Sequence, residues 1–382
     1  MKPARILVTG ATGFIGSRLC ELLSLQHRLP YRALVRNFSR ATRIARLDTE
    51  LVGGDLLDRG SLAQAVEGCE VVINLAHAED KTAAQETTHL VEACARAGVR
   101  RLVHMSSMAV HGPSPKLPVL TERTATIERW GEAYSDAKAA AEAVVTAAGK
   151  RGLFETVVLR PTIVYGPYSF FVTPIVQDAR RGIISLIDGG RGLCNAVYVD
   201  DVCDAVMAAV DHDEAVGGAF LINGDDRITW GDFITAFAAT VDGEKTVHDH
   251  SLDQITAHWR AQRPRALDSI TAAIRLAFSP AFHAQLATIA PVGKLIRSTK
   301  EVVTRRITAE QKMALKSGLK ARTGSTDVTP VRIPNQGRVV REAYRSWISN
   351  ELAKARLGWK PAYPFALGAQ RTGEWLRFAR MA

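Results

Sequence analysis

The chain has 382 residues, 47% of them hydrophobic, and a net charge of +10 at neutral pH. This length and hydrophobic content are enough for a large core, in one large domain or two closely joined ones. The five cysteines form no C-x-x-C pair, so no metal site is expected. No run of about 18 uninterrupted apolar residues occurs, which argues against a membrane-spanning helix.

The cysteines and the start of the chain indicate the compartment. Cys20, Cys69, Cys94, Cys194 and Cys203 are scattered, as is usual for a reduced intracellular protein. A strand-like run begins almost at once, at Arg5–Val8, without a charged head and an apolar stretch before it. We therefore expect a cytoplasmic protein.

Basic residues are concentrated in the last third of the chain. Residues 245–382 hold 24 Lys and Arg against 9 Asp and Glu, whereas the remainder holds 25 against 30. A basic surface can attract phosphates, acidic lipid headgroups or nucleic acid, or it can be a solvated helical face without a ligand. No nucleic-acid-binding motif is present, so nucleic acid is not expected as a partner.

The first two thirds of the chain alternates strand-like and helix-like segments. Short runs rich in β-branched residues predict strands at Ile6–Val8, Ala33–Val35, Val71–Leu75, Leu102–Met105 and Thr156–Leu159. Longer segments between them predict helices at Phe14–Leu25, Ser61–Val66, Thr87–Ala97 and Tyr134–Ala148. This alternation predicts an α/β fold with a parallel sheet that is covered by helices on both faces.

The pattern changes near Lys245. Residues 250–320 indicate helices interrupted at Pro264, Pro280 and Pro291, and residues 321–337 indicate a loop. A last helix is expected after Phe365.

Three glycines stand between the first predicted strand and the first predicted helix. One glycine permits a tight turn, another lets the backbone approach a pyrophosphate, and the third lets the helix pack closely on the strand. The helix N-terminus then presents free N–H groups to the anion. We expect the pyrophosphate of a dinucleotide to bind at this turn, which consists of Gly10, Thr12, Gly13, Phe14, Ile15 and Gly16.

Residues after the next three strands are expected to contact the rest of the dinucleotide. Arg36 stands where an acidic residue would bind the ribose hydroxyls, and it suits a 2′-phosphate, with Arg40 and Arg43 close behind. This favours NADP, with NAD as the alternative. Asp55 and Leu56 are expected to reach the adenine, and Leu75 and Ala76 lie where small residues let the backbone pass the cofactor.

Tyr134 and Lys138 lie four residues apart at the start of a predicted helix, so they share one face. A phenol has a pKa near about 10, and a nearby ammonium is expected to lower the pKa of Tyr134. Tyr134 can then exchange a proton with a substrate hydroxyl or carbonyl, and Lys138 can hold the nicotinamide ribose. Ser107 follows the strand Leu102–Met105, at the edge that lines the ligand crevice, and is expected to hydrogen-bond the reacting oxygen.

Together these features resemble the extended short-chain dehydrogenase/reductases, of the NAD-dependent epimerase/dehydratase type. The resemblance covers residues 4–240 and 355–375. Its motifs are T-G-A-T-G-F-I-G at 9–16, G-D-L at 54–56, N-L-A at 74–76, H-M-S-S-M-A-V-H-G at 104–112, Y-S-D-A-K at 134–138, L-R-P-T-I-V-Y-G-P at 159–167, V-Y-V-D-D-V at 197–202 and L-G-W-K-P at 357–361.

The resemblance implies an organisation and a set of catalytic residues. It implies a doubly wound Rossmann domain at 1–165, with strand and helix returns in 195–225, and a smaller, mostly helical substrate-binding part at 166–382. That part includes an enlarged basic helical region at 245–345. Hydride transfer at nicotinamide C4 is implied, with Ser107, Tyr134 and Lys138 as catalytic residues and with Pro161 and Ile163 flanking the nicotinamide.

Several positions depart from the nucleotide-sugar enzymes of this family. Ile163 replaces a common substrate-binding asparagine, and Cys194 replaces an arginine that holds a substrate phosphate, with Arg191 nearby as a substitute. The helix asparagine that often completes the catalytic set falls near Ala83. Met108 and Ala109 replace the acid/base pair of the sugar dehydratases, which leaves epimerase, reductase and dehydrogenase.

Three functions stay open. The first is hydride transfer to or from a carbinol or ketone carbon of a sugar or sugar nucleotide. The second is an NADPH-dependent ketone reductase, similar to 3β-hydroxysteroid dehydrogenases, on an apolar small molecule. The third is a non-catalytic NADP-binding regulator. A homodimer is compatible with each.

The stretch 267–306 allows two interpretations. An apolar segment at 267–290 stands beside a basic amphipathic one, Lys294–Arg306. The stretch is either an ordinary cap over the active site or a weak contact with an acidic membrane surface.

Overall fold

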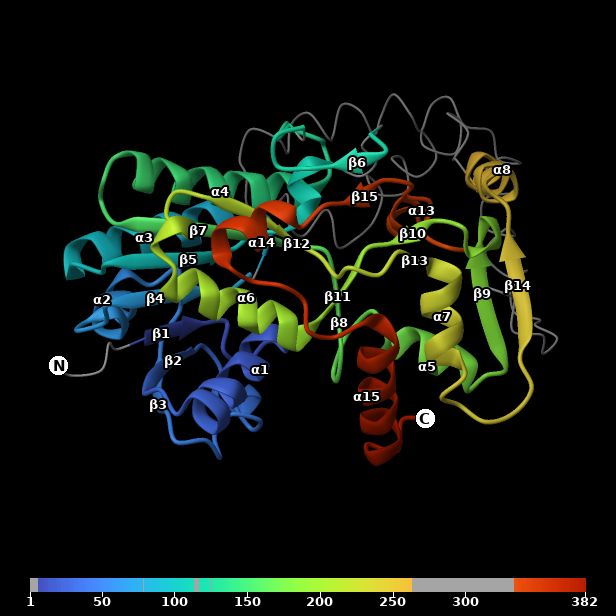
Figure 1. Cartoon of the computed structure of the whole chain (residues 1–382), viewed down its shortest axis with the longest axis horizontal. Coiled ribbons are helices and arrows are strands. Elements are labelled where there is room, and N and C mark those ends of the chain that lie inside the picture. The colour runs from blue at the N-terminus through green and yellow to red at the C-terminus, as the bar shows by residue number, and fades with distance from the viewer. Residues whose placement is uncertain (1–5, 78, 113–116, 125, 263–332) are drawn as a thin grey trace, which may run out of the picture. The chain divides into compact units, whose positions relative to one another are not determined.

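A computed structural model describes residues 6–77, 79–112, 117–124, 126–262 and 333–382 (Figure 1). The chain divides into two compact units, one of residues 1–252 and 334–382 and the other of residues 253–333. The described part of the second unit consists mainly of helix α8 (Leu252–Gln262). Most of the expected basic helical region, including the segment 267–306, lies outside the described residues. None of the helices in the described ranges is long and apolar enough to cross a membrane.

The core of the first unit is a seven-stranded parallel sheet with the order β12-β7-β5-β4-β1-β2-β3. The order runs outward from β1 in both directions, which is the doubly wound arrangement. The predicted α/β fold class is therefore confirmed. The strands are β1 (Ile6–Thr9), β2 (Tyr31–Val35), β3 (Glu50–Gly53), β4 (Val71–Asn74), β5 (Arg101–Met105), β7 (Glu155–Pro161) and β12 (Ala219–Ile222).

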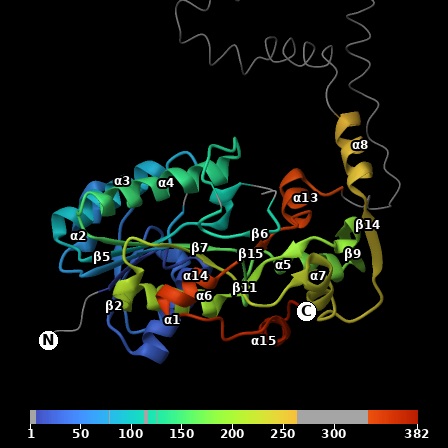
Figure 2. The same cartoon turned by 45° about the horizontal axis from the view of Figure 1, so that its top comes forward.

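Helices cover both faces of the sheet (Figure 2). On one face lie α1 (Phe14–Leu22) and α6 (Val199–Asp211), and on the other lie α2 (Arg59–Val66), α3 (Ala83–Ala97) and α4 (Ala133–Lys150). Successive residues of a strand point to opposite faces, so Ile6 and Val8 pack in one apolar cluster and Leu7 packs in the other. This two-sided burial explains why the strands are apolar throughout rather than alternating.

The first helix ends earlier than predicted. The α-helix stops at Leu22, and a π-helical turn (Leu23–His27) follows and ends at Arg28, which has a positive φ of 52°. The predicted helix at Phe14–Leu25 therefore contains a change of helix type that its hydrophobic pattern does not show.

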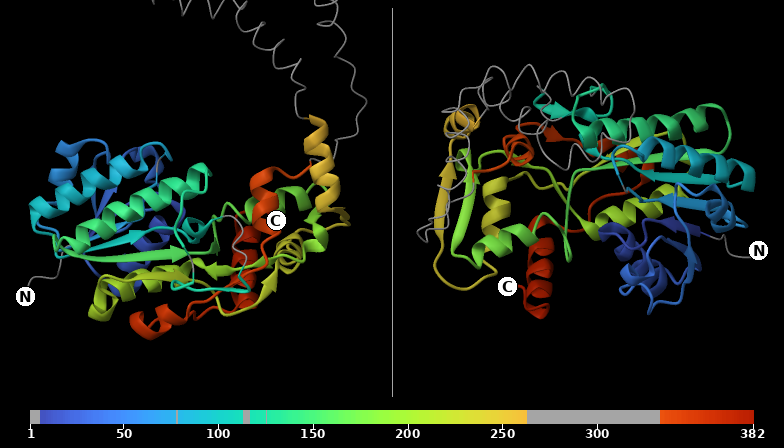
Figure 3. Two further views of the ribbon diagram at one scale, coloured as in Figure 1. Left: turned by 90° about the horizontal axis from the view of Figure 1, so that it is seen from above. Right: turned by 180° about the vertical axis from the view of Figure 1, so that it is seen from behind.

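The remaining described elements of the first unit form a smaller part beside the sheet (Figure 3). Four two-stranded pairs occur there: β8 (Ile163–Tyr165) with β11 (Ala196–Tyr198), β9 (Ile183–Ile187) with β14 (Thr246–His250), β10 (Leu193–Cys194) with β13 (Ile228–Thr229), and β6 (Val119–Leu120) with β15 (Trp347–Ile348). The helices are α5 (Thr173–Ala179), α7 (Trp230–Ala238), α13 (Gln336–Glu342), α14 (Glu351–Leu357) and α15 (Phe365–Phe378). The first unit thus contains residues 1–165 together with 166–252 and 334–382 of the expected second domain, and a boundary at 165/166 stays a prediction.

Candidate active site

The predicted binding residues lie beyond the carboxyl ends of the strands. The seven strands are parallel, so their carboxyl ends share one edge of the sheet. The order of strand connections reverses at β1 and β4, and such a reversal leaves a crevice for a ligand. The glycine turn follows β1, and Leu75 and Ala76 follow β4.

The glycine turn has the geometry that a pyrophosphate needs. Gly10 has a φ of +69°, and a Cβ there would lie 2.6 Å from the carbonyl carbon of Leu75. A Cβ on Gly16 would collide with the carbonyl oxygen of Gly10. Gly13 is the N-cap of α1 and makes no side-chain cap. The turn therefore presents bare backbone at a helix N-terminus, and its residues fit a dinucleotide.

Exposed arginine lies where the adenosine end would be. Arg36 follows β2 and is 60% exposed, with its guanidinium 3.8 Å from the carboxylate of Asp55. Arg40 is also exposed. Arg43, by contrast, donates twice to Glu21 at 2.8 and 3.0 Å and lies over the ring of Tyr168. Arg36 and Arg40 are thus more accessible than Arg43 to a 2′-phosphate.

Tyr134, Lys138 and Ser107 come together at the end of β5. Tyr134 lies in the first turn of α4, is 38% exposed, and shares a hydrogen bond with Ser107. Lys138 is buried one turn later and donates to the carbonyl oxygen of Met105 at 3.1 Å. The structure therefore places these three predicted residues side by side, with the phenol reaching the surface.

The pKa of Tyr134 is shifted upward in this structure, opposite to the predicted lowering. Burial raises the pKa of Tyr134, and the carboxylates of Asp80 and Glu132 raise it further, whereas the hydrogen bond with Ser107 lowers it. Burial also lowers the pKa of Lys138 to about 8. The phenol is consequently protonated at neutral pH. Lys138 loses its proton at a lower pH than an ordinary lysine does.

A ladder of polar side chains runs across three strands below the site. The hydroxyl of Thr9 donates to Asn74 Oδ1 at 2.6 Å, and Asn74 Nδ2 donates to His104 Nδ1 at 3.1 Å. Burial lowers the pKa of His104 to about 3, so its ring is neutral and carries its proton on Nε2. Sequence reasoning missed this ladder, although Asn74 and His104 both stand in the quoted motifs.

A second buried network distinguishes the two serines that follow β5. Ser106 donates to Glu142 at 2.6 Å, and Glu142 accepts two further hydrogen bonds from Arg160, which also donates to His111. All four side chains are less than 9% exposed. The side chain of Ser106 is therefore hydrogen-bonded in the interior, and Ser107 is the serine that interacts with Tyr134.

The positions that depart from the nucleotide-sugar enzymes are apolar or already partnered. Of these positions, Ile163 begins β8 and Cys194 is fully buried in β10. Pro161, which is expected to flank the nicotinamide with Ile163, is buried at the end of β7. Arg191 is 68% exposed and pairs with Asp188, so its charge is already partnered at the surface. Within the described residues, no group of three or more potential metal ligands occurs.

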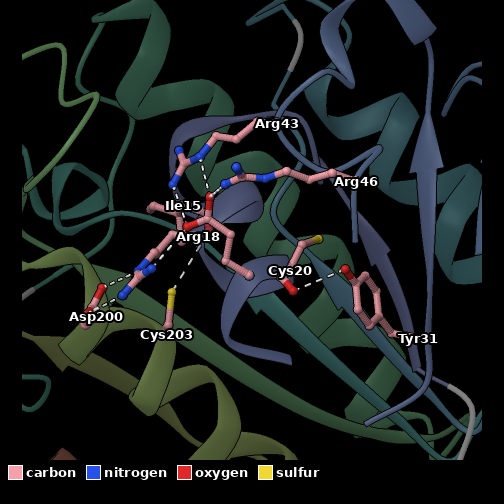
Figure 4. A network of polar contacts seen from close by, with 9 residues as sticks. Ile15, Arg18, Cys20, Tyr31, Arg43, Arg46, Asp200 and Cys203 are labelled. Carbon is pink, nitrogen blue, oxygen red and sulfur yellow. Dashed lines mark hydrogen bonds and ion pairs between the residues drawn. The ribbon is translucent and has the colours of Figure 1, made fainter. Parts of the chain in front are cut away.

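Ionic contacts tie α1 to α6 beneath the glycine turn (Figure 4). Arg18 on α1 donates to both carboxylate oxygens of Asp200 on α6, at 2.7 and 2.8 Å. Glu21, one turn after Arg18, accepts from Arg18 and from Arg43. This network holds the helix whose first turn would carry the pyrophosphate.

Comparison with known proteins decides the family. Residues 6–222 match the model of the NAD dependent epimerase/dehydratase family. The chain belongs to this family. The family membership identifies an NAD(P)-dependent enzyme of the oxidoreductase and epimerase class, with a nicotinamide dinucleotide as cofactor.

Two curated relatives are named as reductases. The 4-hydroxy-2-methyl-3-oxo-4-farnesyl-3,4-dihydroquinoline-1-oxide ketoreductase of Stigmatella aurantiaca is 31% identical over 233 residues, which are 58% of this chain and 68% of that protein. The 2-alkyl-3-oxoalkanoate reductase of Shewanella oneidensis is 25% identical over 251 residues, which are 60% of this chain and 64% of that protein. The chain thus spans about two thirds of the length of each.

Solved structures of nucleotide-sugar enzymes share the fold. The dTDP-glucose 4,6-dehydratase of Bacillus anthracis, in complex with NAD, superposes with a TM-score of 0.66 at 20% identity. The superposition covers 98% of this chain and 97% of that chain. At this identity the likeness shows the fold, and it does not extend to the substrate.

Proposed function

We propose that the protein is an NADPH-dependent ketone reductase that acts on a small molecule with apolar groups around its carbonyl. The observation that carries the proposal is the cluster of Ser107, Tyr134 and Lys138 at the end of β5, with the phenol protonated and reaching the surface. A protonated phenol is the form that donates a proton to a carbonyl oxygen.

Residues at the carboxyl ends of the strands would hold the cofactor. The backbone of Gly10, Gly13 and Gly16 would bind the pyrophosphate, Arg36 would bind the 2′-phosphate, and Lys138 would hold the nicotinamide ribose. The bound nicotinamide supplies a hydride at C4 to the carbonyl carbon. Pro161 and Ile163 would pack on the nicotinamide ring and exclude water from it.

The chain's own side chains handle the proton. Ser107 would donate a hydrogen bond to the substrate oxygen and so position the carbonyl beside Tyr134. Tyr134 would then donate its phenolic proton to that oxygen as the negative charge develops, which yields the alcohol. The charge of Lys138 would stabilise the phenolate that remains until solvent returns the proton.

Apolar positions favour this substrate class over sugar nucleotides. Ile163 and the buried Cys194 offer no polar group to a sugar or a phosphate, and the relatives from Stigmatella and Shewanella are both named as reductases of ketones with apolar substituents. Sugar-nucleotide epimerisation, the first of the three functions expected above, is the second candidate. The shared fold of the nucleotide-sugar enzymes favours it.

Turnover by purified protein distinguishes these functions. We expect NADPH oxidation with 3-oxo acids and alkyl-substituted cyclic ketones, and no interconversion of UDP-glucose and UDP-galactose. Tyr134→Phe should lower kcat by about 10²–10⁴-fold while NADPH still binds, as measured by quenching of tryptophan fluorescence. Epimerisation of UDP-glucose without reduction of any ketone would refute the proposal.

The cofactor preference tests the role of Arg36. Arg36→Ala should weaken NADPH binding at least tenfold, because the guanidinium makes charged hydrogen bonds to a phosphate, and should leave the affinity for NADH nearly unchanged. Arg46→Ala is the control, since Arg46 is 72% exposed on the same segment. Equal loss of affinity for both cofactors would contradict recognition of a 2′-phosphate.

A further inference from the structure

A histidine and an aspartate between β4 and α3 lie against the catalytic residues. The ring of His77 contacts the ring of Tyr134 edge to face, with 5.3 Å between the ring centroids and 89° between the ring planes. Nε2 of His77 donates to the carboxylate of Asp80 at 3.0 Å. Asp80 is thus linked to the phenol through one side chain, and neither residue belongs to the predicted catalytic set.

Close packing of two helices brings this pair to the site. Helices α3 and α4 lie side by side (Figure 2), and Ala83 at the start of α3 packs with two alanines of α4. Small side chains at a helix contact let the two helices approach closely. The segment that ends in Asp80 leads directly into α3, and Lys138 lies near the start of α4. The helix contact therefore holds this segment beside the catalytic residues.

The neutral state of His77 leaves the charge of Asp80 in place. Burial lowers the pKa of His77, and the ammonium of Lys138 lowers it further, whereas the carboxylates of Asp80 and Glu86 raise it in part. Because the net shift is downward, the imidazole is neutral at pH 7 and donates its Nε2 proton to Asp80 without cancelling the negative charge. That charge can then act on the catalytic residues.

The carboxylate of Asp80 acts on both members of the catalytic pair. Burial lowers the pKa of Lys138 to about 8, and Asp80 opposes this effect because a nearby negative charge favours the ammonium. Burial raises the pKa of Tyr134, and Asp80 and Glu132 add to the rise because they disfavour the phenolate. His104 on β5 is neutral, because burial lowers its pKa to about 3. Asp80 thus favours the protonated form of both catalytic side chains.

We infer that His77 and Asp80 are positioning residues for the catalytic pair. His77 packs against the phenol of Tyr134 and fixes its orientation. Asp80 holds His77 and supplies the negative charge that keeps Lys138 and the phenol protonated. The inference rests on the proposed function, in which a protonated phenol donates to the ketone oxygen. The two residues therefore favour reduction of the ketone over oxidation of the alcohol, because oxidation needs the phenolate as a base.

NMR titration of the protein without cofactor or substrate tests the role of Asp80. The Cε signal of Lys138, assigned by its absence in Lys138→Met, should titrate about one pH unit lower in Asp80→Asn. This is the lower end of the effect of a neighbouring opposite charge, because the side chain of Asp80 is 37% exposed. The imidazole signal of His77, assigned by its absence in His77→Phe, should titrate at lower pH in Asp80→Asn and at higher pH in Lys138→Met.

The matched control is Glu79→Gln, since it removes the same charge from an exposed neighbour of Asp80. It should leave both titrations unchanged. Lys138 and His77 signals that titrate in a folded Asp80→Asn as they do in the wild type would overturn the inference.

Substitution of His77 tests its role in orienting the phenol. His77→Ala should lower kcat for ketone reduction by about 2–10-fold, which corresponds to the loss of an aromatic pair. His77→Phe should restore most of the loss, because an aromatic ring still packs on Tyr134. The affinity for NADPH should be unchanged in both variants. A kcat of the wild-type value in His77→Ala, or an equal loss in both variants, would contradict this role.

The pH profile separates the inference from the proposed function. Asp80→Asn should move the fall in kcat/KM for ketone reduction from about pH 8 to about pH 7, and Asp80→Glu should restore part of the shift. Ketone reduction with both the profile and the titrations unchanged in Asp80→Asn would defeat the inference and leave the reductase standing. Shifted titrations, without reduction of any ketone by the wild type, would support the action of Asp80 on Lys138 and defeat the reductase.

Discussion

Two adjacent serines after β5 differ completely in environment. The side chain of Ser106 is buried and bonded to Glu142, whereas that of Ser107 meets the phenol of Tyr134. Consecutive residues of an extended chain point to opposite sides. The backbone alone therefore divides the pair into an interior residue and a residue at the site.

Substitution of the two serines should separate stability from activity. Ser107→Ala should lower kcat by about 10²–10³-fold, as for loss of a donor to a developing oxyanion, with little change in the free energy of unfolding. Ser106→Ala should lower the free energy of unfolding by about 1–3 kcal/mol, because it leaves a buried oxygen of Glu142 with one donor fewer. Steady-state kinetics and urea unfolding measure the two effects, and equal effects of both substitutions would contradict the assignment.

The pKa values of Tyr134 and Lys138 predict a pH dependence. Lys138 carries its charge below its pKa of about 8 and loses it above, whereas the raised pKa of Tyr134 keeps the phenol protonated over that range. We therefore expect kcat/KM for ketone reduction to fall as the pH rises through about 8. In Lys138→Arg the decline should move to higher pH, since a guanidinium stays protonated. A wild-type profile that stays flat to pH 9.5 would exclude this role of Lys138.

At the scale of elements, the contact between α1 and α6 decides where the glycine turn lies. Arg18 and Asp200 join the two helices by a bidentate ion pair with Asp200 nearly buried, and Glu21 links the same cluster to Arg43. The residues involved are far apart in sequence and appear in no local pattern. The placement of α1, and so of its first turn, depends on this tertiary contact.

Breaking this ion pair should cost far more than breaking an exposed one. Asp200→Asn should lower the free energy of unfolding by about 1.5–3 kcal/mol, as for a hydrogen bond to a charged group. The control is Glu92→Gln, which removes the exposed pair of Arg59 with Glu92 and should cost about 0–1 kcal/mol. Urea unfolding at pH 7 measures the free energy of unfolding of both variants. Similar decreases would show that the ion pair between α1 and α6 contributes no more to stability than an exposed ion pair does.

At the scale of the whole first unit, one buried carboxylate fastens the C-terminal segment to the sheet domain. Asp201 on α6 accepts hydrogen bonds from the backbone N–H groups of Ala362 and Tyr363, and its own carbonyl oxygen accepts one from Trp359. The residue is fully buried. Because this segment leads into α15, the carboxylate helps to join the two parts of the unit.

The same carboxylate should make stability depend on pH. Burial raises the pKa of Asp201 to about 7, above its value of about 3.9 in an unfolded chain. The folded state thus holds the proton of Asp201 more tightly than the unfolded state does. The contribution of Asp201 to the free energy of unfolding is therefore fully present below about pH 4 and is lost as the pH rises to about 7.

Comparison with an uncharged side chain measures this contribution. Relative to Asp201→Asn, the wild type should lose up to about 4 kcal/mol of unfolding free energy between pH 4 and pH 7. Asp48→Asn controls for the loss of a surface carboxylate, since Asp48 is exposed. A difference between wild type and Asp201→Asn that is independent of pH would contradict the linkage.

The sequence by itself determined the parallel α/β fold, the glycine turn and the grouping of Ser107, Tyr134 and Lys138. These features are local or repeat regularly: a strand, a turn and a helix follow each other within a few residues, and parallel strands bring their carboxyl ends to one edge. Motif spacing is therefore sufficient to predict them.

Only the tertiary structure decided the environment of these groups. The raised pKa of Tyr134, the ladder of Thr9, Asn74 and His104, and the ion pair of Arg18 with Asp200 all depend on contacts between distant segments. Burial and pairing are properties of the folded chain, because solvation and Coulomb interactions act through space and not along the sequence. For that reason the motifs could indicate which residues come together, whereas their protonation states and hydrogen-bond partners had to be found in the fold.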